Sequence, residues 1–389
     1  MPVSPPSALV VLLASVLKPV DDTRMRGKFA ETLAGRAHTR VHIAGRNAGN
    51  PSAGAAKISL HPIFNGPRLS LGRLAAQWHY GQLLRRLKPN LVIVHAPELL
   101  PLTLLWQALG RGRKFLYDIR ENYALNVRTQ RVYQGLTRRG LAAGLRWVEA
   151  WAARRAAGII LAEASYAAEL PFLRGLPPAR VVVLENKYQP QPGEPLRPRP
   201  IQLPPPTEPL RLLYSGTISE LNGVREAIAL AAQLHVAWPG GVRLTIIGFC
   251  QQPALLRQLE QQSAMHADWL TLIGGARPVP HAAIVAEIGR SHLGLLAYRP
   301  HASTARCRPT KLFEYLAQGL PVLATPNPLW QQVLEAHGAG LTVDFAPPTD
   351  GPALAARLQG HAFYPNGIPA DVLWAGEGKK LWHLLDSVI

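Results

Sequence analysis

The sequence RPTKLFEYLAQGLPVLAT, residues 308–325, decides how the rest of the chain is interpreted. Leu312 and Tyr315 recur at helical spacing, which predicts a short helix in the middle of this segment. Gly319 stands where a left-handed residue commonly ends a helix, and Pro321 prevents the helix from continuing. The apolar residues that follow predict a buried strand.

The start of this helix suits a phosphorylated ligand. Its first turn has unpaired backbone N–H groups and the positive end of the helix dipole. Lys311 adds a full positive charge there, and Glu314, one turn later, can accept hydrogen bonds from hydroxyl groups. Together they predict a sugar-nucleotide site. The alternative is that Lys311 and Glu314 pair with each other on a solvated helix face.

The segment resembles the donor-binding signature of GT-B-fold glycosyltransferases, above all the retaining enzymes of family 4. That signature runs Glu, two residues, Ala, one residue, Gly, one residue, Pro-Val, and it is matched here by Glu314, Ala317, Gly319, Pro321 and Val322. The resemblance implies that Glu314 binds the ribose of the donor.

The chain departs from the family at one acidic position. A second glutamate normally lies eight residues before the first, and this chain has Arg306 there. Arg306 cannot take over the role that the resemblance gives to the missing acid.

Length and composition predict a two-domain globular protein. The chain has 389 residues, of which 48% are hydrophobic. Its two cysteines, Cys250 and Cys307, exclude a disulfide framework and favour a reducing compartment. The apolar run 8–17 lacks a preceding basic segment and is too short to span a bilayer, so we interpret it as a buried strand; the run 99–109 is interpreted as a core helix.

The formal net charge of +18 predicts a polyanionic neighbour. Nucleic acid, an anionic membrane surface and phosphorylated substrates are the candidates, and a compositional preference for arginine is the alternative. The sequence lacks the aromatic-basic strand motifs and the recognition-helix pattern of nucleic-acid-binding domains, so no nucleic-acid partner is expected.

Apolar strands alternate with helical segments throughout, which predicts an α/β class of parallel, doubly wound sheets. The predicted strands are 8–15, 41–44, 91–95, 114–118, 158–162 and 181–184 in the first half, and 210–214, 242–247, 270–273, 293–297, 322–325 and 340–343 in the second. A glycine-rich loop is expected after residue 44.

The proline-rich segment 189–209 cannot enter a helix or a central strand and predicts a linker. We therefore expect the GT-B architecture, with two Rossmann-like domains facing a cleft. Residues 1–188 are the predicted acceptor-binding domain, 210–370 the nucleotide-sugar-binding domain, and 371–389 a C-terminal helix that crosses back to the first domain.

Ligands of parallel sheets bind at the carboxyl ends of the strands, so the loops there are expected to carry the site residues. The first loop carries Asp21, Asp22 and Arg24, which the resemblance makes acceptor contacts; helix capping by Asp21, Asp22 or Thr23 is the alternative.

The loop after the strand 114–118 carries the candidate catalytic residues Asp118, Arg120 and Glu121, because this loop faces the acceptor and the sugar in similar transferases. His95 and Glu98, at the end of a neighbouring strand, are further candidates for acceptor binding. A histidine in this position is more often a packed, hydrogen-bonded core residue than a catalyst.

In the second half, the strand 210–214 leads into a glycine turn, where Gly216, Thr217 and Ser219 are candidates for binding the donor phosphates. Many family members have Arg and Lys at the positions of Thr217 and Asn222, as a cationic clamp on the diphosphate. Hydroxyls and backbone N–H groups bind phosphate more weakly than a charge-assisted pair does.

The loop 299–308 supplies other cations. We expect Lys311, with Arg306 or Arg308, to replace the missing pair, and Leu312 to lie in the same donor site. The chain has no phosphate-binding G-x-x-x-x-G-K-[ST] loop, no G-x-G-x-x-G fingerprint and no Asp-x-Asp motif. An ATPase and a nicotinamide enzyme are thereby disfavoured, and neither a metal nor a cofactor is expected beside the nucleotide sugar as co-substrate.

The segment 131–155 predicts a helix with an arginine-rich face. Arg139, Arg146 and Arg154, flanked by Trp147, form a stripe that suits an anionic membrane surface, and a solvated helix face is the alternative.

These patterns together predict a cytoplasmic glycosyltransferase, peripheral at the inner face of the membrane. We expect a retaining enzyme that moves a sugar to a cell-envelope or exopolysaccharide acceptor, including a lipid-linked one. Three alternatives stay open: an inactive GT-B protein serving as a partner or regulatory subunit, a basic nucleic-acid binder, and a nucleotide-sugar epimerase.

Overall fold

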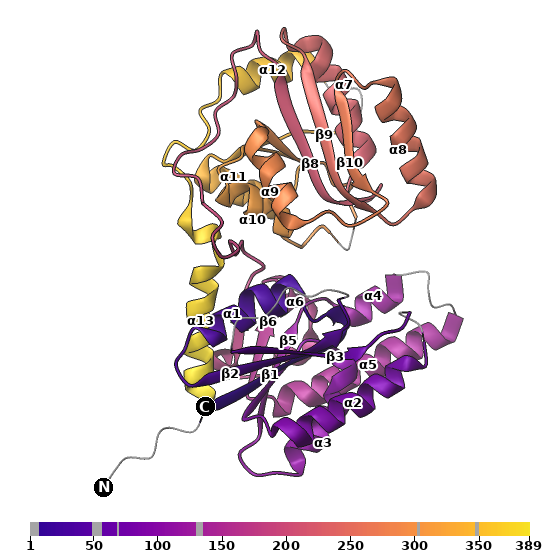
Figure 1. Cartoon of the computed structure of the whole chain (residues 1–389), viewed down its shortest axis with the longest axis vertical. Helices are drawn as coiled ribbons and strands as arrows, with labels where there is room; N and C mark the ends of the chain where they lie inside the picture. Colours follow the sequence, from indigo (N-terminus) through magenta and orange to yellow (C-terminus); the bar gives the residue numbers. More distant parts are fainter. Residues whose placement is uncertain (1–7, 49–56, 68–69, 130–134, 302–303, 347–349) are drawn as a thin grey trace. The chain divides into compact units, whose positions relative to one another are not determined.

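A computed structural model describes residues 8–48, 57–67, 70–129, 135–301, 304–346 and 350–389. The chain forms two compact units, each with its own parallel sheet (Figure 1). Unit 1 comprises Met1–Gln191 and Trp374–Ile389, and unit 2 comprises Pro192–Leu373. The proline-rich segment 189–209 contains the first boundary between them.

The sheet of unit 1 has strands in the order β3-β2-β1-β4-β5-β6-β7, and every pairing described in it is parallel. The strands are β1 (Leu9–Pro19), β2 (Thr39–Arg46), β3 (Ile58–Phe64), β4 (Leu91–Val94), β5 (Lys114–Ile119), β6 (Gly158–Leu161) and β7 (Val181–Val183).

Helices cover both faces of this sheet because both faces are apolar. Leu12 and Ala14 of β1 belong to the core under α2 (Gly72–Leu87), α3 (Leu100–Ala108) and α5 (Gly135–Arg155). Val11 and Leu13 point the other way, as alternation along a strand requires, into a core shared with α1 (Glu31–Ala34) and α13 (Trp374–Val388). The short helices of this unit are α4 (Tyr123–Thr129), α6 (Tyr166–Glu169) and the π-helix η1 (Thr23–Ala30).

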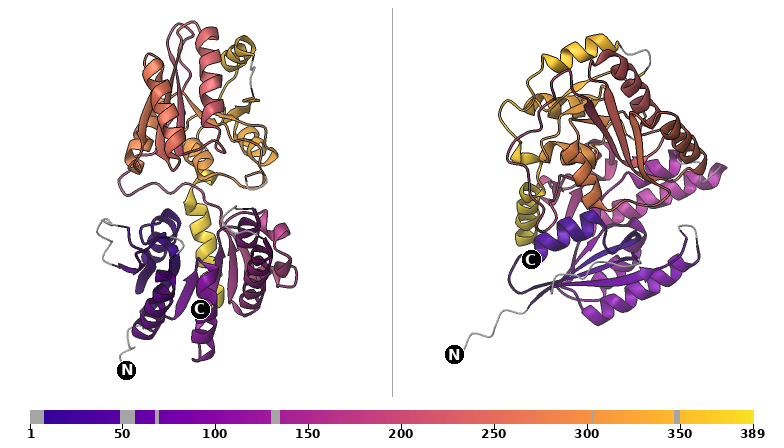
Figure 2. Two further views of the ribbon diagram at one scale, coloured as in Figure 1. Left: turned by 90° about the vertical axis from the view of Figure 1, so that its right-hand side faces the viewer. Right: turned by 45° about the horizontal axis from the view of Figure 1, so that its top comes forward.

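The last helix, α13, packs in unit 1, as Figure 2 shows. Trp374 donates from Nε1 to Thr32 Oγ1 at 2.9 Å, and its ring lies 5.5 Å from that of Phe29. Further along, Leu384 approaches Gly158, where an added Cβ would lie only 3.0 Å from its Cδ1. The helix therefore completes one of the two cores of this unit.

The sheet of unit 2 has the order β10-β9-β8-β11-β12-β13, again with parallel pairings. Its strands are β8 (Leu210–Ile218), β9 (Val242–Cys250), β10 (Leu270–Gly275), β11 (Leu293–Leu296), β12 (Val322–Ala324) and β13 (Gly340–Thr342). One core lies under α7 (Val224–Ala237), α8 (Pro253–Met265) and α12 (Gly351–Gln359). Figure 1 places α9 (His281–Arg290), α10 (Thr310–Ala317) and α11 (Pro328–His337) over the other face.

The expectations for secondary structure are confirmed for the predicted strands and for the helix in 308–325, which is α10. Gly319 has φ +65°, and a side chain there would meet Ile368 and Pro200, so glycine is required. The prediction of a loop after residue 44 is wrong in part, because the segment that follows contains the strand β3. This edge strand is interrupted by polar residues and Pro62, which hides its pattern.

Candidate functional site

The centre of the candidate site in unit 2 is a buried ammonium group. Lys311 is the second residue of α10, and only 8% of it is exposed. Its Nζ lies 4.8 Å from the centre of the Tyr214 ring and 5.1 Å from that of Tyr298. Among the described residues, Nζ has no hydrogen-bond partner. The aromatic faces attract the cation without using its three N–H donors.

Burial changes the acidity of this group. Loss of hydration lowers the pKa of Lys311 from 10.5 to about 8, and the negative charge of Glu314 offsets part of that effect. Near neutral pH the ammonium is therefore charged, buried and short of acceptors. An anion entering beside it would supply the missing acceptors.

The ammonium lies where strand order reverses in the sheet. From β8 the chain builds outward through β9 and β10, whereas β11 pairs on the other side of β8. Such a switch point at the carboxyl ends of the strands is where open parallel sheets bind ligands. Gly216, near the end of β8, has φ +90°, and a Cβ built on it would lie 3.9 Å from Lys311 Nζ.

The amino end of α10 carries no side-chain cap. Its N-cap residue is Pro309, whose side chain has no hydrogen-bonding atom, and the Leu312 N–H donates to the Pro309 carbonyl at 2.9 Å. The Leu312 side chain is completely buried and its N–H is already paired, so this residue, predicted to lie in the donor site, belongs to the core.

The predicted phosphate loop after Gly216 is closed by its own hydrogen bonds. Asn222 donates from its side-chain amide to the Thr217 carbonyl at 2.9 Å, and from its backbone to Ser219 Oγ at 3.1 Å. Asn222 therefore shapes the turn, while the Thr217 side chain stays exposed.

The arginines expected to replace the missing cations lie in a loop that is tied to α11. Trp330 donates from Nε1 to the Cys307 carbonyl at 2.7 Å, and Asn327 donates to the Ala305 carbonyl at 3.0 Å. Arg306 is exposed and Arg308 is half-buried. Their contact with donor phosphates stays a prediction, and residues 302–303 of the predicted loop lie outside the described part of the chain.

Glu314 contacts a residue that the sequence did not single out. His281, the first residue of α9, donates from Nε2 to Glu314 Oε1 at 2.5 Å. The carboxylate side chain is 13% exposed and the imidazole 32%. The alternative in which Lys311 and Glu314 pair on a solvated face does not hold, because Lys311 is buried and Glu314 hydrogen-bonds His281.

In unit 1, three predicted site residues form a closed cluster. Asp118, at the end of β5, accepts from Arg24 Nε at 2.9 Å and Nη2 at 2.7 Å, and from His95 Nδ1 at 2.7 Å. Arg24 also donates to the Leu184 carbonyl and to Asn186 Oδ1, at 2.9 and 2.8 Å. All three side chains are 0–1% exposed, so the cluster joins β4, β5 and η1 inside the protein.

Charge pairing dominates this cluster. Burial alone would raise the pKa of Asp118, but the Arg24 charge and the hydrogen bonds from Arg24 and His95 outweigh it and hold the pKa well below its ordinary value. Burial lowers the pKa of His95, with Asp118 opposing it. His95 Nε2 has no partner among the described residues. We interpret the ion pair as a structural element of unit 1.

More accessible polar groups lie beside this cluster. Arg120 makes a two-pronged pair with Asp22, at 2.8 and 3.0 Å, while Asp22 also caps η1 by accepting from two backbone N–H groups. Glu121 accepts from Lys18 at 3.1 Å, and both side chains are a little over one-third exposed. Helix capping is confirmed for Asp22, whereas Asp21 is exposed.

The remaining acceptor candidate is Glu98, which pairs with Arg73 of α2 at 2.6 Å. Sequence reading missed Arg73, Lys18 and the aromatic residues around Lys311. Tyr214 lies within β8 and Tyr298 just after β11, so their positions near the carboxyl ends of neighbouring strands were the available signal.

The basic stripe predicted on α5 needs one correction. Arg139, Trp147 and Arg154 are exposed, but Arg146 turns inward. It donates to Asn122 Oδ1 at 2.8 Å and stands over the Phe172 ring at 5.6 Å. The helical phase places this arginine against η3 (Pro171–Leu173) and the loop after β5, rather than in solvent.

No described helix is long and apolar enough to cross a membrane. In the same part of the chain, no three or more His, Cys, Asp or Glu residues are grouped so that they could hold a metal ion.

The chain is similar to known proteins in part of its sequence and in its fold. Residues 24–187 match the family described as "Glycosyl transferase 4-like domain". No curated protein sequence matches the chain. Solved structures do match: sucrose-phosphate synthase from Thermosynechococcus elongatus has a TM-score of 0.65 at 15% identity, over 98% of this chain and 99% of that one.

Two further solved structures have a similar fold over nearly the whole chain. The catalytic domain of starch synthase IV from Arabidopsis thaliana, bound to ADP and acarbose, has a TM-score of 0.64 at 12% identity, covering 98% of this chain and 99% of that one. WaaG, a glycosyltransferase involved in lipopolysaccharide biosynthesis, has a TM-score of 0.54 at 15% identity, covering 97% and 95%. The two parallel sheets, the match over residues 24–187 and these likenesses show that the chain is a GT-B-fold protein resembling glycosyltransferase family 4, as its 308–325 segment predicted.

Proposed function

We propose that the chain is a glycosyltransferase that takes a sugar from a nucleoside diphosphate sugar. The observation that carries this proposal is the buried Lys311 ammonium, which has no hydrogen-bond partner among the described residues and stands at the uncapped start of α10. A diphosphate would supply acceptors for the ammonium and for the first N–H groups of α10.

The same geometry suits the departure of a diphosphate. Negative charge grows on the leaving group as the glycosidic bond breaks, so a fixed cation and oriented backbone N–H groups stabilise the transition state more than the ground state. The ADP in the starch synthase structure supports a nucleotide as the ligand class for this fold.

Isothermal titration calorimetry with uridine, guanosine and adenosine diphosphates tests donor binding. At least one nucleotide is expected to bind wild type and to bind Lys311→Met more weakly. Glu220→Gln is the matched control, since Glu220 pairs with Arg225 at a more exposed position beside the same loop. The absence of binding by all three nucleotides would contradict the proposal.

The finer part of the proposal concerns the reaction. We infer transfer with retention of configuration and without a metal, to a cell-envelope or exopolysaccharide acceptor, supported by the resemblance to family 4 and by the likeness to WaaG. An NMR assay of the product anomer, run with and without EDTA, tests retention and metal independence. Formation of an epimerised nucleotide sugar without transfer would favour the epimerase alternative.

A second candidate function is that of a catalytically inactive partner subunit. It is favoured by Thr217 and Asn222, which close the glycine turn where family members carry two cations, and by Arg306 in place of an acid. Nucleotide binding without turnover, across a panel of nucleotide sugars and acceptors, would support this candidate.

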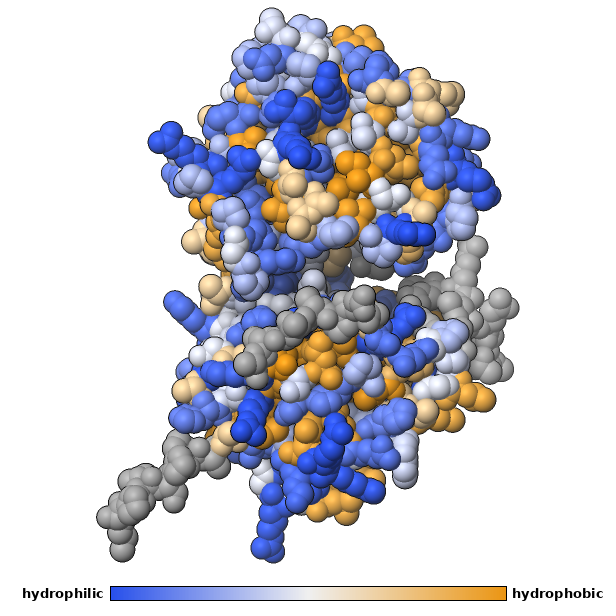
Figure 3. Space-filling model, viewed as in Figure 1, coloured by the Kyte–Doolittle hydropathy of each residue, from blue (hydrophilic) through white to orange (hydrophobic). Residues whose placement is uncertain are grey.

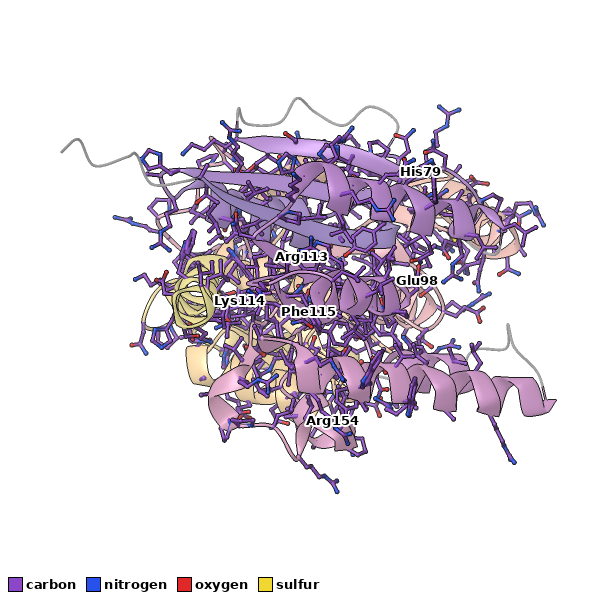
Figure 4. All side chains as sticks on the ribbon, turned by 90° about the horizontal axis from the view of Figure 1, so that it is seen from below. His79, Glu98, Arg113, Lys114, Phe115 and Arg154 are labelled. Atoms are coloured by element: carbon purple, nitrogen blue, oxygen red, sulfur yellow. The ribbon has the colours of Figure 1, made fainter. Side chains whose placement is uncertain are left out.

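The proposed site of action is the membrane surface. Trp147 is 67% exposed and stacks on Trp151 with ring centres 5.9 Å apart, close to exposed arginines of α5. Figure 4 labels Arg154 on α5, and Figure 3 shows hydrophobic side chains among hydrophilic ones on the surface of unit 1. An exposed indole beside cations suits the interface of an anionic bilayer.

A further inference from the structure

The contact between His281 and Glu314 has no part in the function proposed so far. His281 begins α9, directly after Pro280, and Glu314 lies in the middle of α10, 33 residues later. The two helices are separated in sequence by β11 and the loop that follows it. The 2.5 Å hydrogen bond between the imidazole and the carboxylate thus connects the two helices on one face of the sheet.

This bond engages only one oxygen of the carboxylate. His281 donates to Oε1, and the described residues provide no partner for Oε2. A glutamate side chain has three rotatable bonds, and it loses several rotamers when one oxygen is fixed. With Oε1 fixed, Oε2 keeps a defined position from which it can accept hydrogen bonds from a ligand.

The surroundings favour the protonated imidazole. The hydrogen bond to Glu314 raises the pKa of His281, burial opposes that effect, and the charges of Glu314 and Glu194 add to it. The charged groups that act on the imidazole are thus Glu314 of α10 and Glu194 of the segment before β8. The Glu194 side chain is also fixed in place, because its carboxylate accepts a hydrogen bond from the Gln318 side-chain amide at 2.8 Å.

Glu314 stands one turn after Lys311 on α10. A nucleotide whose phosphates reach the start of this helix would bring its ribose near the next turn. We propose that His281 is a positioning residue, which holds the Glu314 carboxylate so that Oε2 binds the ribose hydroxyls of a nucleoside diphosphate. This inference rests on the proposed function, since it requires the diphosphate to bind at Lys311.

The test compares two ligands that differ only in the ribose hydroxyls. Dissociation constants are measured by calorimetry for the best-binding ribonucleoside diphosphate and for its 2′,3′-dideoxy analogue. Wild type is expected to prefer the ribonucleotide by at least about tenfold, the lower end of what one hydrogen bond to a charged group contributes. His281→Ala is expected to lose most of this preference while binding the dideoxy analogue as wild type does.

Three further variants separate positioning from general damage. His281→Gln keeps a hydrogen-bond donor and is expected to keep the preference for the ribonucleotide. Glu314→Gln is expected to lose that preference. Lys311→Met is expected to weaken the binding of both nucleotides by the same factor. In wild type the preference is expected to decline as pH rises, because a neutral imidazole still donates to Glu314 but holds the carboxylate less strongly than the imidazolium does. His281→Gln, which does not titrate, is expected to show no such decline. The ratio of the two constants cancels any titration of Lys311.

The outcomes are distinct. Full preference in a folded His281→Ala protein would overturn the inference and leave the proposed function intact. If His281→Ala does not fold, the pH profile decides, and equal profiles for wild type and His281→Gln would overturn it. Failure of wild type to bind either nucleotide would overturn the proposed function and this inference together.

Discussion

Replacing Lys311 by Met is expected to stabilise the ligand-free protein while weakening nucleotide binding. Methionine has a similar length and no charge, so it can fill the space between the Tyr214 and Tyr298 rings. The substitution removes a buried ammonium that has no hydrogen-bond partner among the described residues. Stability and affinity should therefore change in opposite directions.

The gain in stability follows from the acidity of the lysine. Burial lowers its pKa from 10.5 to about 8, and at roughly 1.4 kcal/mol per tenfold change in acidity this corresponds to a cost of about 3 kcal/mol for the charged form. Attraction to the two rings returns about 1 kcal/mol. The free energy of unfolding at pH 7 is thus expected to rise by about 2 kcal/mol in Lys311→Met.

The loss of affinity follows from the bonds that the ammonium would make. A hydrogen bond to a charged group is worth about 1.5–3 kcal/mol, which corresponds to roughly 10- to 150-fold in the dissociation constant of a nucleoside diphosphate. A nucleoside without phosphates should bind both proteins equally.

Urea unfolding at pH 7 measures the first effect and calorimetry the second. Measuring unfolding again near pH 10 supplies an internal control, since the lysine of the ligand-free wild type is then mostly neutral and the difference from Lys311→Met should shrink. A variant that is less stable than wild type, or that binds the diphosphate equally well, would refute this reasoning.

Three other outcomes are expected. The affinity of wild type for a nucleoside diphosphate should fall as pH rises above about 8, by up to tenfold per pH unit, because burial lowers the pKa of Lys311 and only the ammonium binds phosphate; calorimetry from pH 7 to 9.5 would show the fall, and a flat profile would contradict it. Asp118→Asn should lower the free energy of unfolding by about 3–5 kcal/mol, because it leaves Arg24 charged and fully buried. Asp386→Asn, which breaks the exposed pair with Arg36, should change that free energy little. Equal effects of the two substitutions in urea unfolding would show that burial of the pair is unimportant. Trp147→Ser should reduce co-sedimentation with vesicles that contain anionic lipid severalfold, without reducing nucleotide binding; equal sedimentation would exclude this indole from membrane contact.

The strands that the sequence predicted share a simple pattern. In a parallel sheet covered on both faces, nearly every position of a central strand is apolar. The strand β4 and the first part of β1 therefore stand out as apolar runs, and β5 has a shorter one in Phe115–Tyr117. The edge strand β3 is only partly buried and contains Pro62, so its signal is lost among polar residues. Central strands were therefore predictable and this edge strand was not.

The candidate site was predictable where one local segment carries it. Lys311 and Glu314 belong to the single helix α10, and Gly319, just beyond its end, stops it before the next strand. Residues next to one another in the sequence therefore specify both ends of this helix. The partner of Glu314 is 33 residues away on another helix, and the inward turn of Arg146 depends on Phe172 of a distant segment. Such contacts arise only when helices pack, and no local pattern encodes them.

The return of α13 to unit 1 has a consequence for synthesis on the ribosome. Trp374, Leu381 and Leu385 belong to the same core as Val11 and Phe29, so segments translated before and after unit 2 form one hydrophobic interior. All of unit 2 leaves the exit tunnel before that interior can close. Unit 1 can thus complete this core only after unit 2 has been synthesised, and until then the nascent chain must keep the uncovered face of its first sheet from aggregating.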